Sequence, residues 1–161
     1  MRNRGFEKIS LEQWMNDTSW LKDQEVVYNQ IKLPVRGTKN SAGYDIFSPV
    51  DILLYPNQSM KVPTGLKAYM LPSEYIMIVP RSSMGFKFFM RLANTVAVGD
   101  SDYYNNKDNE GHYWIKIRNE NDEPMEIKAG QAFAQAIFMN YLLADDDSAN
   151  AERVGGIGST N

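Results

Sequence analysis

Short apolar runs separated by chain breakers constrain the fold of this chain more than any other feature of its sequence. From Glu25 onward, runs of four to eight residues alternate with clusters such as Tyr55-Pro56-Asn57 and Asn119-Glu120-Asn121-Asp122. Short strands at this spacing, without sustained amphipathic helices between them, predict an all-β antiparallel sandwich, jelly roll or barrel. The expected strands are Val26 to Leu33, Asp51 to Leu54, Ser59 to Pro63, Tyr75 to Val79, Thr95 to Val98, Tyr113 to Ile117, Met125 to Ile127 and Phe133 to Tyr141.

The two ends of the chain depart from this pattern. Ser10 and Gln13 have the spacing of a capping box, which predicts a short helix from Leu11 to Asn16. Residues 144–161 are polar and then glycine-rich, so they form either a frayed terminus or a flexible arm that orders over a ligand. We expect one domain over residues 1–161, with an N-terminal extension over 1–24 and a C-terminal arm over 144–161.

The composition excludes several kinds of chemistry. The chain has no cysteine and one histidine, His112, so thiol catalysis and thiolate metal sites are excluded and a histidine-rich metal centre is not expected. A net charge of −3 without blocks of like charge argues against binding along a nucleic-acid backbone. There is neither a signal-peptide pattern nor an apolar run approaching ~18 residues, so we expect no membrane span and a cytoplasmic location.

Two segments could bind an anion. Arg81 follows the apolar run Tyr75 to Val79 and precedes two hydroxyl residues and a glycine; arginine binds phosphate through two parallel hydrogen bonds. The segment from Gly155 to Thr160, next to Arg153, offers backbone amides and hydroxyls that can approach a polyphosphate closely. A strand-end turn with an exposed arginine and a flexible tail are the alternative interpretations.

Asp100 and Asp102 form a third candidate site at the end of an expected strand. A carboxylate there could bind a metal, act as a base toward water, or start a turn, which is the usual role of aspartate in such a place. Asn94, whose amide both donates and accepts hydrogen bonds, and Tyr103, whose ring can pack on a sugar or base, favour a binding site.

Five segments stand in one order over most of the chain. They are Ala42-Gly43-Tyr44-Asp45, Pro80-Arg81-Ser82-Ser83-Met84-Gly85, Asn94-Thr95-Val96-Ala97-Val98-Gly99-Asp100-Ser101-Asp102-Tyr103, Gly130-Gln131-Ala132-Phe133-Ala134-Gln135 and Arg153-Val154-Gly155-Gly156-Ile157-Gly158-Ser159-Thr160. In this order they resemble the five motifs of the trimeric dUTP pyrophosphatases, the dUTPase family. Arg4 to Glu7 and Asn109 to His112 are similar to the Gram-positive bacterial and phage branch of that family.

The resemblance implies a jelly-roll-like β-barrel, the β-clip of dUTPases, and hydrolysis of dUTP to dUMP and pyrophosphate. This activity limits uracil in DNA and supplies dUMP for thymidylate synthesis. Mg²⁺, held mainly by substrate phosphates and waters, would assist attack of water on the α-phosphorus. The family works as a homotrimer with shared active sites, without nucleic acid or membrane, in the cytosol of a bacterium or a phage-infected host.

The resemblance also implies a role for each motif residue. Asp100 would be the general base, Asn94 and the backbone of Thr95 to Val98 would read uracil, and Tyr103 would pack on the deoxyribose. Asp45 would order waters around the metal, with Asp102 supporting the site beside Asp100. Phosphate or nucleotide contacts are expected from Arg81, Ser82, Ser83, Gly85, Gln135, Arg153, Ile157, Gly158, Ser159 and Thr160.

Two departures from the family pattern bear on activity. Gly99 replaces an apolar β-branched residue before the base, so Asp100 is expected to be held less firmly, and Ile157 replaces an aromatic that stacks over uracil. Tyr104, Tyr113 or His112 could supply the missing ring. The alternative function is a weakly active or inactive dUTPase-fold module that binds a regulatory protein. A plain β-sandwich of the capsid or lectin kind would leave the five motifs as coincidence.

Overall fold

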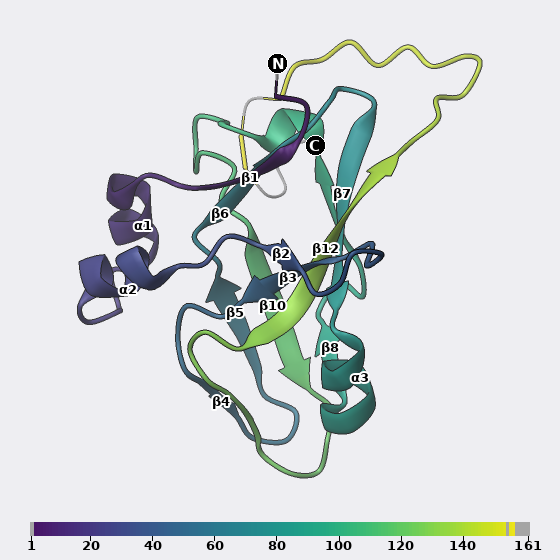
Figure 1. Ribbon diagram of the computed structural model, residues 1–161. Coiled ribbons are helices and arrows are strands. Elements are labelled where there is room, and N and C mark those ends of the chain that lie inside the picture. Colours follow the sequence, from purple (N-terminus) through teal and green to yellow (C-terminus); the bar gives the residue numbers. More distant parts are fainter. Residues whose placement is uncertain (1, 154, 157–161) are drawn as a thin grey trace.

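The chain folds into antiparallel sheets around one apolar core, which confirms the expected all-β architecture (Figure 1). We describe residues 2–153 and 155–156 of a computed structural model. The larger sheets have the strand orders β2-β3-β12-β7-β9 and β5-β10-β8, and the pairs β1-β6 and β11-β4 complete the fold. The strands are β1 (Gly5–Lys8), β2 (Val35–Arg36), β3 (Tyr44–Phe47), β4 (Ile52–Leu54), β5 (Ser59–Pro63), β6 (Leu66–Tyr69), β7 (Glu74–Pro80), β8 (Met90–Leu92), β9 (Ala97–Asp100), β10 (Trp114–Asn119), β11 (Met125–Ile127) and β12 (Ala132–Asn140).

Strand β7 lies between β12 and β9 and fixes the geometry of the five-stranded sheet. Its alternating pattern buries Ile76 and Ile78 in the core and turns the residues between them to the other face. The register pairs Tyr75 with Asp100 near the start of β7 and Pro80 with Ala134 at its end. A one-residue slip would move every buried side chain to the opposite face, so the core fixes this register.

The short helices are α1 (Leu11–Asp17), α2 (Gln24–Gln30) and α3 (Ser82–Phe88), with a 3-10 helix, η1, over Ser101–Tyr103. Helix α1 confirms the predicted cap, because the Ser10 hydroxyl accepts a hydrogen bond from the Gln13 amide at 3.1 Å. The other half of the capping box is replaced: the Ser10 amide donates to the Glu110 carboxylate at 2.9 Å instead of to Gln13.

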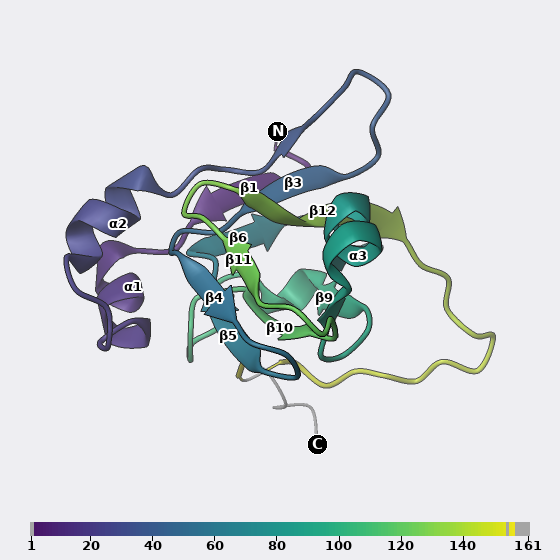
Figure 2. The same ribbon diagram turned by 90° about the horizontal axis from the view of Figure 1, so that it is seen from below.

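The prediction of a strand from Val26 to Leu33 is wrong, because this segment begins with helix α2. Val27 and Tyr28 pack against the core, and Ile31 follows at helical spacing, so the apolar residues form one face of a helix. The Tyr28 hydroxyl donates to the Ile9 carbonyl at 2.7 Å, which holds the helix in place. Figures 1 and 2 show α1 and α2 together at one side of the sheets.

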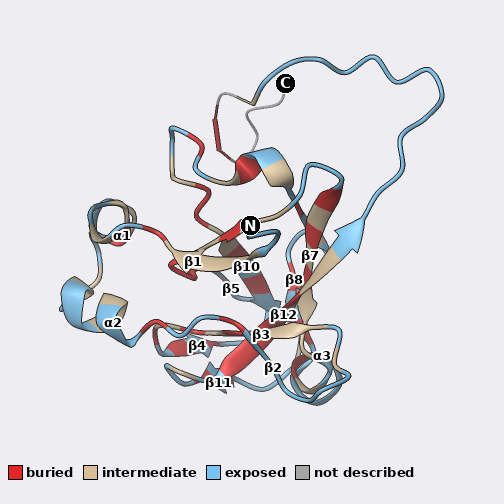
Figure 3. Cartoon of the chain, turned by 45° about the horizontal axis from the view of Figure 1, so that its top comes forward, coloured by how far each residue is buried: buried red, intermediate tan, exposed pale blue. Residues whose placement is uncertain are grey.

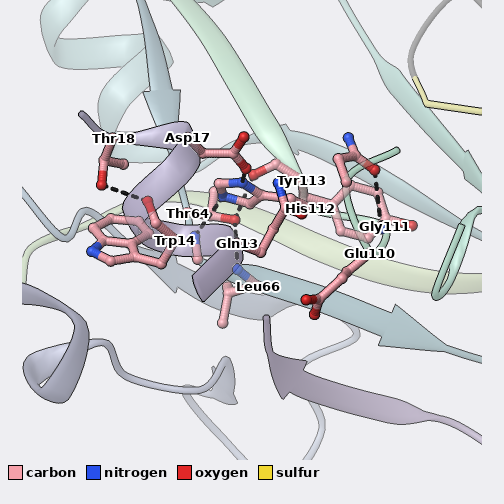
Figure 4. A network of polar contacts seen from close by, with 12 residues as sticks. Gln13, Trp14, Asp17, Thr18, Thr64, Leu66, Glu110, Gly111, His112 and Tyr113 are labelled. Carbon is pink, nitrogen blue, oxygen red and sulfur yellow. Dashed lines mark hydrogen bonds and ion pairs between the residues drawn. The ribbon is translucent and has the colours of Figure 1, made fainter. Parts of the chain in front are cut away.

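His112 joins the N-terminal helices to the core (Figure 4). Its side chain is fully buried, and its Nε2 accepts a hydrogen bond from the Gly65 amide at 2.9 Å. Its Nδ1 therefore carries the proton of the neutral ring and donates to the Asp17 carboxylate, 2.5 Å away. The buried ring of Trp14 in α1 also packs near His112, with its centroid 6.3 Å from that of the histidine ring.

Figure 3 shows exposure concentrated in the segment after β12, which leaves the sheets in a wide arc and returns toward the strands near the N-terminus in Figure 1. The predicted arm therefore lies outside the core over most of its described length. Within residues 2–153 and 155–156, no helix has the length and apolar character needed to cross a membrane.

The buried His112 gives the first prediction. Burial lowers the pKa of His112, and the opposing effect of Asp17 offsets this only in part. A lowered pKa in the folded state means that the unfolded chain binds the proton more readily. We expect the free energy of unfolding to fall as the pH decreases below about 6.5, the ordinary histidine value.

Urea unfolding at pH 7.5, 6.5 and 5.5 measures this effect. Because His112 is the only histidine in the sequence, a change in stability over this pH range can be assigned to it. The His112→Gln variant is the control: it should be less stable at pH 7.5 and show a flatter dependence on pH. Equal slopes in the two proteins would contradict the assignment.

Candidate functional site

The hairpin-like turn that connects β8 and β9 forms one wall of a pocket between the two larger sheets. Strand β8 pairs with β10 and β9 pairs with β7, so this connection leads from one sheet to the other. A tight turn at its tip holds Thr95 at a φ of 64°, in the left-handed region. The cavity has a volume of about 240 Å³ and is lined by Ile78, Asn94, Ala97, Val98, Gly99, Asp100, Tyr103, Tyr113, Trp114 and Arg153. We call it the hairpin pocket.

Arg153 from the C-terminal arm lies at the acidic end of the hairpin pocket. Its guanidinium donates to Asp100 at 2.7 Å and to Asp102 at 2.8 Å. The hydrogen bond to Asp102 and the charges of both carboxylates raise the pKa of Arg153. The arginine side chain is 11% exposed, whereas the carboxylates are 56% and 54% exposed. One cation is therefore shared by two neighbouring carboxylates at this end.

The hydroxyl of Tyr103 is held by hydrogen bonds to the loop that follows this residue. Its buried hydroxyl donates to the His112 carbonyl at 3.0 Å and accepts from the Asn109 amide at 2.9 Å. Asn109 is itself held, because its side-chain oxygen accepts hydrogen bonds from Asn106 and from the Gly111 amide. Burial raises the pKa of Tyr103, so the hydroxyl stays protonated.

Gly99 is buried, and Tyr113 fills the space next to it. A Cβ atom added at Gly99 would lie 2.6 Å from Tyr113 Cε1, closer still to the tyrosine hydroxyl, and 2.8 Å from Ile76 Cγ2. The strand before Asp100 is thus packed by a neighbour in space instead of by a side chain of its own. The expectation that Asp100 is held less firmly after Gly99 stays a prediction.

A second group of predicted residues surrounds Arg81, where β7 ends and α3 begins. Arg81 Nε lies 3.0 Å from an Asp45 oxygen, and Gln135 pairs with Asp45 across β3 and β12. The Gln135 amide donates to the Pro80 carbonyl at 3.3 Å. We call these residues the arginine cluster. Beside it lies a hollow of about 610 Å³ lined by Pro80, Arg81, Ser82, Gly85, Phe86 and Phe89.

The acidic end of the hairpin pocket, at Asp100, and the arginine cluster lie at opposite ends of β7. Asp100 is opposite Tyr75, near the start of the strand, and Arg81 follows Pro80 at its end. Along β7, Pro80 lies five residues beyond Tyr75, the residue opposite Asp100. At ~3.4 Å per residue of extended chain, this separation is about 17 Å. Figure 1 shows this separation, with α3 at the lower end of β7 and the helical turn after β9 near its upper end.

The structure therefore divides the predicted site residues into two groups. Asn94, Val98, Asp100, Tyr103 and Arg153 line one pocket, and Asp102 joins them through Arg153. The second group lies around α3 and comprises Asp45, Arg81, Ser82, Ser83, Gly85 and Gln135. Four predicted contacts, Ile157, Gly158, Ser159 and Thr160, lie outside the described residues.

Sequence reasoning missed part of the pocket wall. Ile78 and Trp114 come from β7 and β10 and carry no local motif. Of the rings considered as a cover for the base, His112 is fully buried, and Tyr104 donates its hydroxyl to Glu7 at 2.6 Å and is absent from the pocket lining. Tyr113 does line the pocket, beside Gly99.

The described residues contain no group of three or more His, Cys, Asp or Glu side chains that could hold a metal ion. In the hairpin pocket, Asp100 and Asp102 are both engaged by Arg153. A hard cation such as Mg²⁺ retains several waters and is commonly held by a few carboxylates together with substrate phosphates. These carboxylates could contribute to holding such an ion together with a polyphosphate.

Comparison with known proteins places this geometry in a family. The sequence model of the dUTPase family matches residues 29–160. The deoxyuridine 5'-triphosphate nucleotidohydrolase of Lactococcus lactis is 45% identical over 132 residues, covering 81% of this chain and 88% of that protein. The chain therefore belongs to the dUTPase family.

Solved structures agree with this assignment. The dUTPase of Streptococcus mutans has 35% sequence identity and a TM-score of 0.69, over 88% of this chain and 98% of that one. A mutant dUTPase from phage phi11 of S. aureus, which coordinates a structural Mg(II) ion, has a TM-score of 0.68 over 93% of this chain and 98% of that one. At 15% identity, the phage protein shows the shared fold alone.

The buried hydroxyl of Tyr103 gives the second prediction. Tyr103→Phe keeps the ring but leaves the Asn109 amide and the His112 carbonyl without this partner, so we expect a loss of about 1–3 kcal/mol in the free energy of unfolding. Urea unfolding measures it. Tyr141→Phe is the matched control, because that residue is 42% exposed and its hydroxyl bonds one surface carbonyl, Pro72. Equal losses in both variants would show that the Tyr103 network contributes no special stability.

Proposed function

We propose that this protein hydrolyses dUTP to dUMP and pyrophosphate. The observation that carries the proposal is the hairpin pocket, in which Asn94, Tyr103 and Asp100 line one cavity in a chain of the dUTPase family. The curated relatives bear the name of this activity, including the Lactococcus enzyme and the 33% identical protein of Haemophilus influenzae.

The base and sugar would occupy the hairpin pocket. Asn94 and the backbone from Thr95 to Val98 would bond the uracil edge, where cytosine leaves buried donors and acceptors unmatched. Tyr103 would support the deoxyribose with its ring face. Its double anchoring through Asn109 and His112 supports this role, because a fixed ring excludes a larger sugar more effectively than a mobile one.

Asp100 would act as the general base. It orients a water molecule and accepts its proton as the water oxygen attacks the α-phosphorus; the bond from that phosphorus to the bridging oxygen breaks and pyrophosphate leaves. The exposed Asp100 carboxylate at the mouth of the pocket can reach such a water. Arg153 would exchange its carboxylate partners for the γ-phosphate, together with Ser159 and Thr160 of the arm.

Arg81, Ser82, Ser83 and Gly85 would bind the triphosphate of a nucleotide held by another subunit. Within one chain they lie about 17 Å along β7 from Asp100, too far to share one triphosphate with it. A homotrimer brings the two groups together between neighbouring subunits. Exposed apolar side chains support such contacts, because Val98 on the five-stranded sheet is 63% exposed and Phe86 on α3 is 87% exposed.

Mg²⁺ would be held by the phosphates and waters, with Asp45 ordering the waters and Gln135 bonding phosphate or the same waters. When bound, the ion neutralises charge on the triphosphate. The structural Mg(II) of the phage phi11 enzyme is a related observation on a protein of the same fold.

The role of Asp100 gives the third prediction. Asp100→Asn keeps the shape but removes the base, so we expect pyrophosphate release from dUTP with Mg²⁺ to fall at least about 100-fold. Asp102→Asn, two residues further on, should lose much less activity, because it keeps the base. Release from dCTP and dTTP should be negligible in all three proteins. Full turnover by Asp100→Asn would remove Asp100 from the mechanism.

The division of the site between chains gives the fourth prediction. Asp100→Asn and Arg81→Ala should each be nearly inactive alone. If they are unfolded and refolded together, sites that combine the intact Arg81 of one chain with the intact Asp100 of another should recover on the order of a quarter of the native activity. Refolding each variant separately and then combining the two is the control. No recovery in co-refolded trimers would mean that each site is built within one chain.

A further inference from the structure

The hydroxyl of Tyr113 is buried without a hydrogen-bond partner in the described part of the chain, and it stands alone in this respect among the buried side-chain polar atoms there. The tyrosine backbone is fully engaged: its amide donates to Leu66 and its carbonyl accepts from Thr64. A buried hydroxyl without a partner costs free energy, so it calls for an explanation, and a partner gained on ligand binding is one. The residue lines the hairpin pocket, where a ligand could supply that partner.

The position of Tyr113 along the pocket identifies the part of the ligand that it faces. Asn94 and Ala97 lie toward one end of the pocket, and Asp100 with Arg153 lies at the other. Gly99, next to Tyr113, precedes Asp100 by one residue of extended strand. The Tyr113 ring centroid is 5.3 Å from that of Tyr103. A nucleotide with its base toward Asn94 and its phosphates toward Asp100 therefore places its sugar beside Tyr113.

We propose that Tyr113 is a specificity-determining residue whose hydroxyl donates a hydrogen bond to the 3'-hydroxyl of the bound deoxynucleotide. This inference rests on the proposed function, because it takes the orientation of the nucleotide from it. A 2'-deoxy sugar carries one free hydroxyl in a nucleoside triphosphate, and that oxygen can accept a hydrogen bond from a phenol. The bond satisfies the buried tyrosine and holds the sugar against Tyr103.

Gly99 makes this contact possible. Any side chain at position 99 would occupy the space of the Tyr113 hydroxyl and would press on Ile76, as the position of an added Cβ shows. The two residues thus form a matched pair in which the small one makes room for the hydroxyl of the large one. The departure at Gly99 is then a change of pocket chemistry, from an apolar wall to a hydrogen-bond donor.

The test compares kcat/KM for dUTP and for 2',3'-dideoxyuridine triphosphate in the native protein, Tyr113→Phe and Tyr104→Phe. Tyr113→Phe should lower the value for dUTP about three- to tenfold, as expected for one lost hydrogen bond, and leave the value for the dideoxy analogue unchanged. Tyr104→Phe is the matched control, because its hydroxyl bonds Glu7 and the residue is absent from the pocket lining; it should leave both values unchanged.

An equal loss for the two nucleotides, or no loss for either, overturns the inference while the proposed function stands. If the native protein releases no pyrophosphate from dUTP, the proposed function fails and the inference fails with it. A second measurement tests the pair: Gly99→Ala should lower kcat/KM for dUTP more in the native background than in Tyr113→Leu, where the space is free. Strictly additive losses would contradict the matched pair.

Discussion

The register of β7 between β12 and β9 determines most of what this protein can do. It sets Asp100 beside the start of the strand and Arg81 beyond its end, and the buried Ile76 and Ile78 prevent the strand from slipping. An extended strand cannot bring its own ends together. The motif residues that the structure describes therefore fall into two groups within one chain, around Asp100 and around Arg81, even though the motifs form one series in the sequence. A second chain is the simplest way to complete the site, which makes assembly part of the proposed chemistry.

The sequence predicted the all-β fold because short apolar runs between chain breakers are typical of antiparallel strands. Breakers bounded the runs that became β5, β11 and β12. Helix α2 was mistaken for a strand because a short apolar run fits both periods. The choice was made by contacts distant in sequence, such as the Trp14 indole donating to the Gln24 carbonyl at 2.9 Å. Helix α3 was missed for a similar reason, since seven residues carry too little periodicity.

The residues of the candidate site that belong to sequence motifs could be predicted, whereas the others could not. Asn94, Asp100 and Tyr103 were found because they follow one another closely, and the hairpin brings them into one pocket. Ile78 and Trp114 were missed because their place in the pocket depends on the pairing of distant strands. The division of the site residues between the hairpin pocket and the arginine cluster could not be predicted either, because the order of the motifs in the sequence says nothing about the distances between them. The resemblance to the family implied shared sites, and the register supplies a physical reason for them.

Arg153 shows how charge couples the arm to the site. Two carboxylates so close to each other repel, and one guanidinium with a hydrogen bond to each relieves that repulsion. A triphosphate entering the pocket brings more negative charge to the same place and competes for the same cation. Transfer of Arg153 to the phosphates would leave Asp100 and Asp102 without their counter-charge, a cost offset by the cations that come with the substrate and by Arg81 of a neighbouring chain. The exchange would free the Asp100 carboxylate for water only when the triphosphate is in place, so the ion pair with Arg153 would keep the base occupied until there is a substrate to attack.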